Sequence, residues 1–547
     1  MSVDEEEQPP APPTEGGTSE DLVASESRAA RVGFLFITGA KIWFLLAATL
    51  LNIGLPRILG DPSLFGDFGV VNTLISILNM VMVTGVIQAV SKRVSERPEF
   101  AGAIRVASMK LQALMGAVVF VLLLVSADWI ATDLLNDPSL ATMIRIGSLI
   151  TFAYAFYGAL IGVLNGLKRF ALQAAFDVGY ATLKVGLMIG LVVLGYGVQG
   201  AFAGFAVAAV TITLIAAIVV RGQSPVGSGQ PGDLGLMSFM LPVMGYVLFM
   251  NVLLQGDVLV VKAAAAGPVR AALELGEASW IELIRASHPL ASSADLISEG
   301  TSFFSGLFKA TKNIALVPYQ GVVAITFVIF PLISRATFED DADATRMYVT
   351  QALRVTLLLV AFVVTGIAAG GAPLLGLLFG DAYELAAGAL MPLLVAMALF
   401  SALYVVASVL TASGHPLDAL ILMLVMSMVL LFTLYTVVER SVAGPELLER
   451  ASWAVLAVTA LAWLAASVDV KWRVGVSVPW WTFLRSALAV ALGVFAANLL
   501  GGDGLVALFG RCAIAGVAFL VALLATRELG SEDLATVRAT LQRRRSR

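Results

Sequence analysis

Runs of about 20 mainly apolar residues recur along almost the whole chain, and each is long enough to cross a bilayer as a helix. The 547 residues are 59% hydrophobic and only 13% charged, with a mean hydropathy of +0.92. Soluble domains carry about 25% charged residues, so this composition indicates an all-α polytopic membrane protein. We predict about fourteen transmembrane helices, at 33–56, 66–90, 108–127, 141–164, 170–194, 199–220, 235–261, 310–332, 352–373, 385–411, 417–438, 450–468, 480–500 and 504–526.

Residues suited to metal binding or redox chemistry are scarce. The chain has one cysteine, Cys512, and two histidines, His288 and His415. A disulfide framework and a Cys/His zinc site are therefore excluded. We expect no metal, no cofactor, no enzymatic activity and no binding to nucleic acid.

The predicted helices group into two lobes of six, followed by two more. The first residues are acidic and rich in proline, a composition typical of a disordered tail. In chain order, the predicted parts are a disordered cytoplasmic tail (1–30), an N-lobe with helices 1–6 (31–221), a cytoplasmic linker (222–233), a C-lobe with helices 7–12 (234–469) that contains an extracytoplasmic insertion (263–308), and helices 13 and 14 with a basic cytoplasmic tail (470–547).

Basic residues in the short loops predict the orientation, because cytoplasmic loops carry an excess of Lys and Arg. Alternate loops hold Lys92, Arg93, Arg97, Lys168, Arg169, Arg221, Lys471 and Arg473. The opposite loops are acidic or uncharged, as at Asp133 and Asp137. Both termini are therefore expected in the cytoplasm. As a separate expectation, the helices span the inner membrane of a bacterial cell.

Two pairs of similar segments indicate an internal repeat. Ser91-Lys92-Arg93 ends helix 2 and Ile333-Ser334-Arg335 ends helix 8, while Phe152-Ala153-Tyr154 of helix 4 is similar to Ala402-Leu403-Tyr404 of helix 10. An offset of six helices gives two lobes of the same orientation, an arrangement found in alternating-access transporters. Chance similarity between apolar helices is the competing explanation.

The insertion 263–308 interrupts the pattern of tight loops. Apolar residues recur at helical spacing across 269–285, and a short apolar stretch follows at 303–308. We interpret these segments as amphipathic helices on the outer membrane interface. A lid over the outer mouth of a cavity, or a docking site for a partner, is the alternative.

Charged residues within the predicted spans are the next indication of function, because each is costly in lipid and usually faces a cavity or a partner. Lys41 lies about eight residues inside helix 1, too deep to reach the interface easily. Asp177 and Lys184 share one face of helix 5 and could also serve packing alone. Arg145, Lys309 and Arg511 lie near helix ends, where we expect their side chains to extend to the interface.

Several motifs resemble those of a known family. Arg57, Leu59-Gly60 and Phe65-Gly66 are similar to the "R-x-LG-x-x-x-FG" signature that follows the first helix of polysaccharide-biosynthesis (Wzx/PST-type) flippases. These flippases belong to the multidrug/oligosaccharidyl-lipid/polysaccharide (MOP) exporter superfamily. The resemblance extends over roughly 31–500 through three further segments: Gly85 to Arg93, Phe330 to Arg335 and Leu377 to Tyr383.

The resemblance implies a MATE-like fold that moves undecaprenyl-pyrophosphate-linked oligosaccharide across the cytoplasmic membrane. It implies that cationic side chains bind the substrate, here Lys41, Arg57, Lys184 and Lys312. Asp177 and Asp257 are assigned to ion coupling or ion pairing. The expected partners are the lipid-linked glycan, membrane lipids, and a glycan polymerase or another envelope assembly protein.

Three alternatives remain open at this point. A lipid II flippase for peptidoglycan has the same fold, and a multidrug and toxin extrusion antiporter has the same lobes. A membrane-bound glycan polymerase or ligase would instead concentrate acid–base groups in a large outer loop, for which 263–308 is short.

Overall fold

The computed structural model describes residues 39–40, 42–224, 235–276, 279–287, 292–323, 342–501 and 504–530. Lys41, the tail 1–30 and most of the linker 222–233 lie outside these residues. A first helix includes Ile42–Leu59. The other helices are α2 (Pro62–Glu96), α3 (Ala101–Trp129), α4 (Leu140–Gly166), α5 (Phe170–Leu191), α6 (Gly197–Gln223), α7 (Leu236–Ala264), α8 (Ala266–Leu275), α9 (Ser279–Ser287), α10 (Ser293–Ala315), α12 (Ala342–Phe379), α13 (Ala387–Ala412), α14 (Pro416–Glu439), α15 (Pro445–Arg473), α16 (Trp480–Asn498) and α17 (Leu505–Ala525).

The all-α polytopic class is confirmed. Within the described residues, 12 helical segments are long and apolar enough to cross a membrane. One of them, 170–223, contains both α5 and α6. The backbone has positive φ at Gly195 and Gly197, and a Cβ on Gly204 would meet the carbonyl oxygen of Leu187, so the two helices run antiparallel. The count of fourteen remains a prediction, since the predicted helix 310–332 lies partly outside the described residues.

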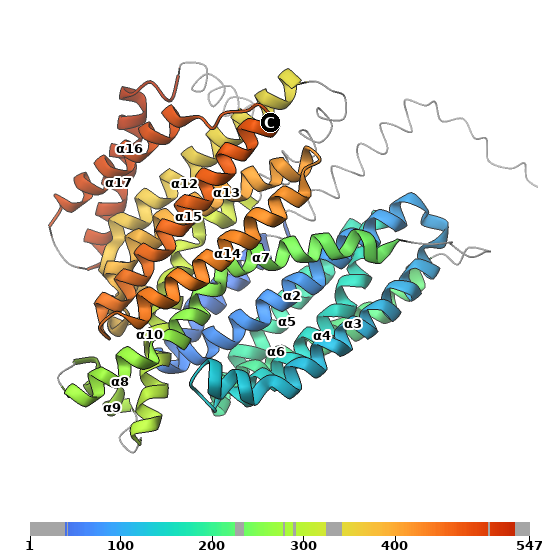
Figure 1. Ribbon diagram of the computed structural model, residues 1–547, viewed down its shortest axis with the longest axis horizontal. Helices are drawn as coiled ribbons and strands as arrows, with labels where there is room; N and C mark the ends of the chain where they lie inside the picture. Colours follow the sequence, from blue (N-terminus) through green and yellow to red (C-terminus); the bar gives the residue numbers. More distant parts are fainter. Residues whose placement is uncertain are drawn as a thin grey trace, which may run out of the picture.

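Two helical bundles lie side by side in Figure 1, one formed by α2–α6 and the other by α12–α17, with α7 and α10 between them. Each bundle has one helix at its centre. Within α4, 72% of the most apolar 18-residue stretch is buried inside the protein. The corresponding share for the segment that contains α13 is 78%. These are helices 4 and 10 of the predicted repeat, and the two-lobe arrangement is confirmed. The residue boundaries of the lobes remain predictions.

The lobes meet where α2 crosses α10. A Cβ at Gly66 would overlap the carbonyl oxygen of Ser302, and a Cβ at Gly306 would overlap the carbonyl oxygen of Pro62. Each glycine therefore faces the carbonyl four residues before the other glycine. Gly66 and Gly306 are 240 residues apart in the sequence, close to the offset of the predicted repeat. The crossing point thus lies on the pseudo-twofold axis between the lobes, and only glycine permits backbones to approach so closely.

The helices of the insertion differ from the predicted ones. The amphipathic segment forms α8 and α9, but their apolar residues Val269, Trp280 and Ile284 are buried against protein. The apolar stretch 303–308 was wrongly assigned to an interface, because it lies inside α10, where Phe304 and Phe308 are buried. The apolar faces therefore pack on neighbouring helices.

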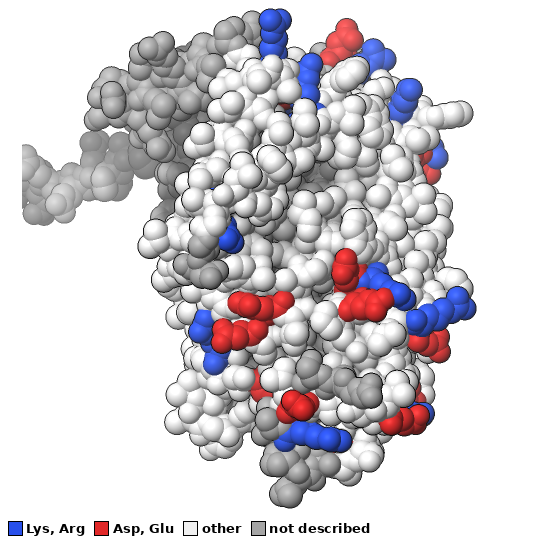
Figure 2. Space-filling model, turned by 90° about the vertical axis from the view of Figure 1, so that its left-hand side faces the viewer, with Lys and Arg blue, Asp and Glu red and all other residues white. Residues whose placement is uncertain are grey.

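The two ends of the bundle are identified by the turns that lie there. We call them the Lys92 end, with the turns near residues 97, 168 and 414, and the Asp137 end, with the turns near residues 60, 137 and 380. Figure 2 shows the face beside α16 and α17, where charged side chains form separate groups and broad areas carry none. Large apolar side chains such as Val125 and Phe432 are exposed, as expected for surfaces that contact lipid.

An ion-pair cluster attaches the C-terminal helices to the C-lobe at the Lys92 end. The buried carboxylate of Glu528, which follows α17, binds Arg354 of α12 at 3.1 Å and Arg485 of α16 at 2.9 Å. Thr482 also donates to it, at 2.8 Å. Burial raises the pKa of Glu528, but these donors lower it more, and the net pKa is below the usual 4.5.

We expect Glu528 to make the stability of the protein dependent on pH. Because its folded-state pKa is depressed, its contribution is complete above the ordinary value of 4.5 and is lost as the pH falls through the folded-state pKa. Melting temperatures of the purified protein at neutral pH and at several values below 4.5 would measure this loss. Glu528→Gln should lower the melting temperature at neutral pH and flatten that part of the profile; a profile identical to that of the parent would contradict the assignment.

Gly306→Ala should destabilise the protein by about 1–3 kcal/mol, because the added methyl group must displace the backbone at Pro62. Gly186→Ala in α5 is the matched control, since a Cβ there has no neighbour within 4 Å. Thermal unfolding in detergent would compare the two variants. Equal melting temperatures would show that the crossing tolerates a side chain.

Candidate functional site

Lys312 and Asp257 form an ion pair between α10 and α7. Their side chains are 1% and 0% exposed, so neither charge has water as an alternative partner. From the sequence, Lys312 is expected to bind substrate and Asp257 to serve ion coupling or ion pairing. The structure brings the two together, and each neutralises the other in this conformation.

A second buried charge cluster joins the lobes at the Asp137 end. The ammonium of Lys262, at the end of α7, donates to Asp137 at 2.8 Å and to the carbonyl of Ser298 at 3.1 Å. It also donates to the hydroxyl of Ser302, which in turn donates to Asp67 of α2. Lys262 and Asp67 are 3.8 Å apart. Asp67 lies on α2 and Asp137 in the turn after α3, both within the predicted N-lobe, whereas Lys262 and Ser302 lie on α7 and α10, which the predicted boundaries assign to the C-lobe.

The turn that carries Asp137 is shaped to hold the end of α7. Asn136 adopts a positive φ of 54°, and its amide donates to the carbonyl of Ala263 at 3.2 Å. Ser139 donates to Asp137 through its hydroxyl at 2.7 Å. Burial raises the pKa of Asp137, but the Lys262 charge and hydrogen bonds from Lys262 and Ser139 lower it more, so its net pKa is below the usual value. The carboxylate therefore stays ionised against Lys262.

Lys309 lies across the lobe interface one turn before Lys312. Its stem packs on Gly69, and its ammonium lies 3.3 Å from the Thr73 hydroxyl of α2. The expectation that it extends to the membrane interface was wrong, because the residue is only 5% exposed within the protein. Among the described residues, no carboxylate lies within 4 Å of its ammonium.

Arg57 contacts the opposite lobe instead of a central cavity. Its guanidinium donates to the carbonyls of Leu378 at 3.0 Å and Gly376 at 3.3 Å, and also to that of Leu377. These carbonyls end α12, where the helix lacks its own donors. In this conformation Arg57 caps α12, and its role in substrate binding remains a prediction.

Asp177 and Lys184 lie within the N-lobe. The ammonium of Lys184 is 3.9 Å from the ring centre of Phe205, a cation–π contact. Near Asp177, Tyr154 packs edge-on against Tyr180 at 5.5 Å between ring centres. The helix that carries Asp177 and Lys184, α5, packs mainly on α6. These two residues do not lie beside Lys312. Their roles in substrate binding and ion coupling remain predictions.

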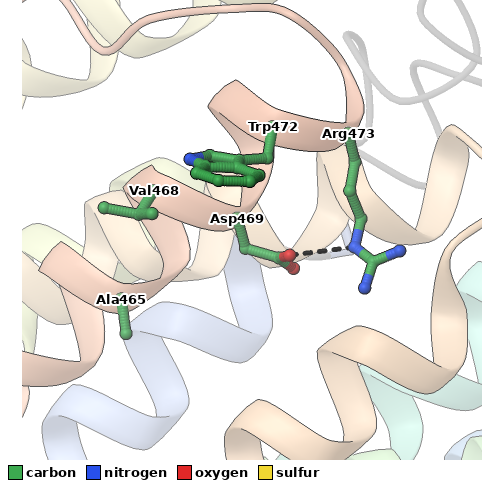
Figure 3. A pocket seen from close by; sticks show the side chains of 5 residues that line it. All are labelled: Ala465, Val468, Asp469, Trp472 and Arg473. Carbon is green, nitrogen blue, oxygen red and sulfur yellow. Dashed lines mark hydrogen bonds and ion pairs between the residues drawn. The ribbon is translucent and has the colours of Figure 1, made fainter.

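A surface pocket lies on α15 at the Lys92 end (Figure 3), lined by Ala465, Val468, Asp469, Trp472 and Arg473. Arg473 binds Asp469 at 2.9 Å and Asp418 of α14 at 2.9 Å. Trp472 is 85% exposed, so the pocket opens to the surroundings.

The Lys262 cluster is the main feature of the site that the sequence does not predict. In the sequence, Lys262 stands at a helix end and Asp137 in a turn, and such positions usually face water. The available signal was a charged residue at the end of α7 followed by a long amphipathic segment. Pairing it with residues 125 and 195 positions away requires the tertiary structure.

Lys312→Met should destabilise the protein by about 3–5 kcal/mol, because it leaves the Asp257 carboxylate buried without its cation. The double variant Lys312→Met/Asp257→Leu should recover most of that loss, because two apolar side chains often replace a buried ion pair at little cost. Thermal unfolding of the three purified proteins would measure both effects. A double variant as unstable as the single one would argue against a pairwise interaction.

Comparisons with known proteins agree with this architecture. The lipid II flippase MurJ, in an inward closed conformation, has a TM-score of 0.67 at 12% identity and covers 91% of this chain and 99% of its own. An inward-facing multidrug resistance MATE family transporter of the MOP superfamily has a TM-score of 0.60 at 16% identity, with 80% of this chain and 94% of its own covered. A MOP superfamily transporter from Pyrococcus furiosus gives 0.52 at 15% identity, covering 81% and 94%.

At these identities the likeness shows a shared fold, and the solved relatives are a flippase and transporters, not enzymes. A search of curated protein sequences finds no match. A family model matches residues 31–337, which is more than half of the chain. The chain therefore belongs to the polysaccharide biosynthesis protein family.

Proposed function

We propose that this protein is a flippase that carries undecaprenyl-pyrophosphate-linked oligosaccharide across the cytoplasmic membrane by alternating access. The Lys92 end, with its excess of exposed Lys and Arg, faces the cytoplasm, and both termini lie there. The Asp137 end faces outside. The family and the fold support a lipid-linked substrate, and the charges at the lobe interface support an anionic head group.

The group of Lys309, Lys312 and Asp257 carries this proposal. Two ammonium groups lie one helical turn apart on α10, and one carboxylate is paired with one of them. Buried charge is costly without a partner of opposite sign, so this group favours the entry of an anion. A pyrophosphate supplies several strong acceptor oxygens and would bind both ammonium groups.

The path of the substrate follows from the position of Lys309. This side chain extends from the C-lobe to Thr73 of the N-lobe, so an anion bound there would contact both lobes. The polyprenyl chain would stay in lipid while the lobes move around the head group. Lys41 and Arg57, both from the first helix, remain proposed additional contacts.

The energy source is an ion gradient or the membrane potential in this proposal. The sequence has no Gly-x-x-x-x-Gly-Lys loop for nucleotides. Asp177, in the N-lobe beside Tyr154, is the proposed coupling residue, because a carboxylate there can exchange a proton or a cation. A glycan polymerase or another envelope assembly protein is the proposed partner.

A lipid II flippase is the second candidate, favoured by the likeness to MurJ over nearly the full length of both chains. Both substrates have the pyrophosphate that the site would bind, so the site does not separate them. Rescue of cells depleted of their own lipid II flippase would support this candidate. Failure of rescue, together with export of a lipid-linked oligosaccharide, would support the proposed function.

Lys309→Gln should reduce flipping about 10- to 100-fold, since a hydrogen bond to a charged group contributes about 1.5–3 kcal/mol. The assay would follow a pyrophosphate-linked oligosaccharide in proteoliposomes. Lys110→Gln, at an exposed position of α3, is the control and should flip at the parental rate. Parental flipping by a stable Lys309→Gln protein would remove Lys309 from the mechanism.

A further inference from the structure

The Asp137 end of the lobe interface is closed by two different kinds of contact. At Gly66 and Gly306 the backbones of α2 and α10 touch, so no side chain separates the lobes there. Beside this crossing, Lys262 binds Asp137 and, through Ser302, Asp67. At the glycine crossing the helices are held together by close backbone packing. In the Lys262 cluster they are held together by ion pairs and hydrogen bonds.

The closure has approximate twofold symmetry. At the end of the first helix, Arg57 binds the last turn of α12, and at the end of α7, Lys262 binds Asp137 in the turn after α3. Each lobe therefore contributes one cation that holds the opposite lobe. The two contacts differ in burial, since Arg57 is exposed and the Lys262 side chain is 0% exposed. Only the Lys262 contact loses its shielding from water when the lobes separate.

The insertion fixes α10 to its own lobe on the side opposite the Lys262 cluster. Gly300 of α10 lies against Val269 of α8 and Trp280 of α9. The indole of Trp280 donates to the carbonyl of Ala443, in the turn between α14 and α15, at 3.1 Å. Through these contacts α8 and α9 connect α10 to the turn between α14 and α15.

We propose that Lys262, Asp137, Asp67 and Ser302 form a latch that holds the outer side of the transporter closed, and that outward opening requires this latch to break. The helices α8 and α9 brace the C-lobe half of the latch. The inference depends on the proposed function only for the orientation of the Asp137 end. The latch places two carboxylates on one lobe and the ammonium on the other, so separation exposes all three charges to water, where each is solvated.

Labelling of a single cysteine from outside the cell tests this proposal without using transport. Cys512→Ser removes the only native cysteine, and Thr73→Cys adds a reporter that is buried in α2 beyond the glycine crossing. A membrane-impermeant maleimide should modify the parent slowly. Lys262→Met should raise the labelling rate at least about tenfold, by shifting the population toward outward-open states.

Two further variants keep the result interpretable if Lys262→Met fails to accumulate. Ser302→Ala removes only the bridging hydroxyl and should raise labelling about threefold. Arg145→Gln breaks the exposed pair with Asp128 at the same end, 2.6 Å long, and should leave the rate unchanged. Parental labelling rates in both Lys262→Met and Ser302→Ala, with the reporter reactive after unfolding, would overturn the latch.

The orientation is checked separately. Leu275→Cys on α8, where the side chain is 77% exposed, should be labelled from outside in every background. If Leu275→Cys is protected in intact cells and reacts only after lysis, the Asp137 end faces the cytoplasm. That outcome would contradict the orientation in the proposed function, and the latch would then be tested in inverted vesicles.

Discussion

The close approach of α2 and α10 is the constraint on which the rest of the lobe interface depends. Without a Cβ at Gly66 and Gly306, the two backbones meet directly, and the lysine side chains near the crossing are almost fully buried. The charged residues next to the crossing must therefore find partners within the protein. Lys262 and Lys312 find carboxylates, and Lys309 reaches a hydroxyl of the other lobe.

The helix contact explains the motif from Arg57 to Gly66, which is similar to the signature of the flippases. Arg57 caps the end of α12, Gly60 turns the chain with a φ of 71°, and Asp61 caps α2 by accepting a hydrogen bond from the Ser63 amide at 2.7 Å. Gly66 then forms the crossing. In this conformation the motif joins the lobes at one end of the molecule, whereas the proposed substrate site lies further along α10. Conformational change and substrate binding would thus depend on different parts of the same two helices.

The partner of each cation was the property that the sequence predicted least well. Lys309 is three residues from Lys312 in the sequence, yet one lacks a nearby carboxylate among the described residues and the other is paired. The resemblance to the flippases assigned Arg57 to substrate binding, but in this conformation it caps a helix of the opposite lobe. Hydropathy reports how costly a charge is in lipid. It contains no information on which distant residue neutralises that charge.

The sequence by itself determined the membrane location of the chain, its helical class and its two similar lobes, because bilayer thickness requires apolar runs of a set length and a repeat is visible as an offset. It also determined the family, through the order and spacing of short motifs. Only the tertiary structure decided that the apolar stretch 303–308 is a lobe contact, and that Lys262 belongs with Asp137 and Asp67. Those outcomes depend on which helix faces pack together, and residues more than a hundred positions apart meet only after the lobes have assembled.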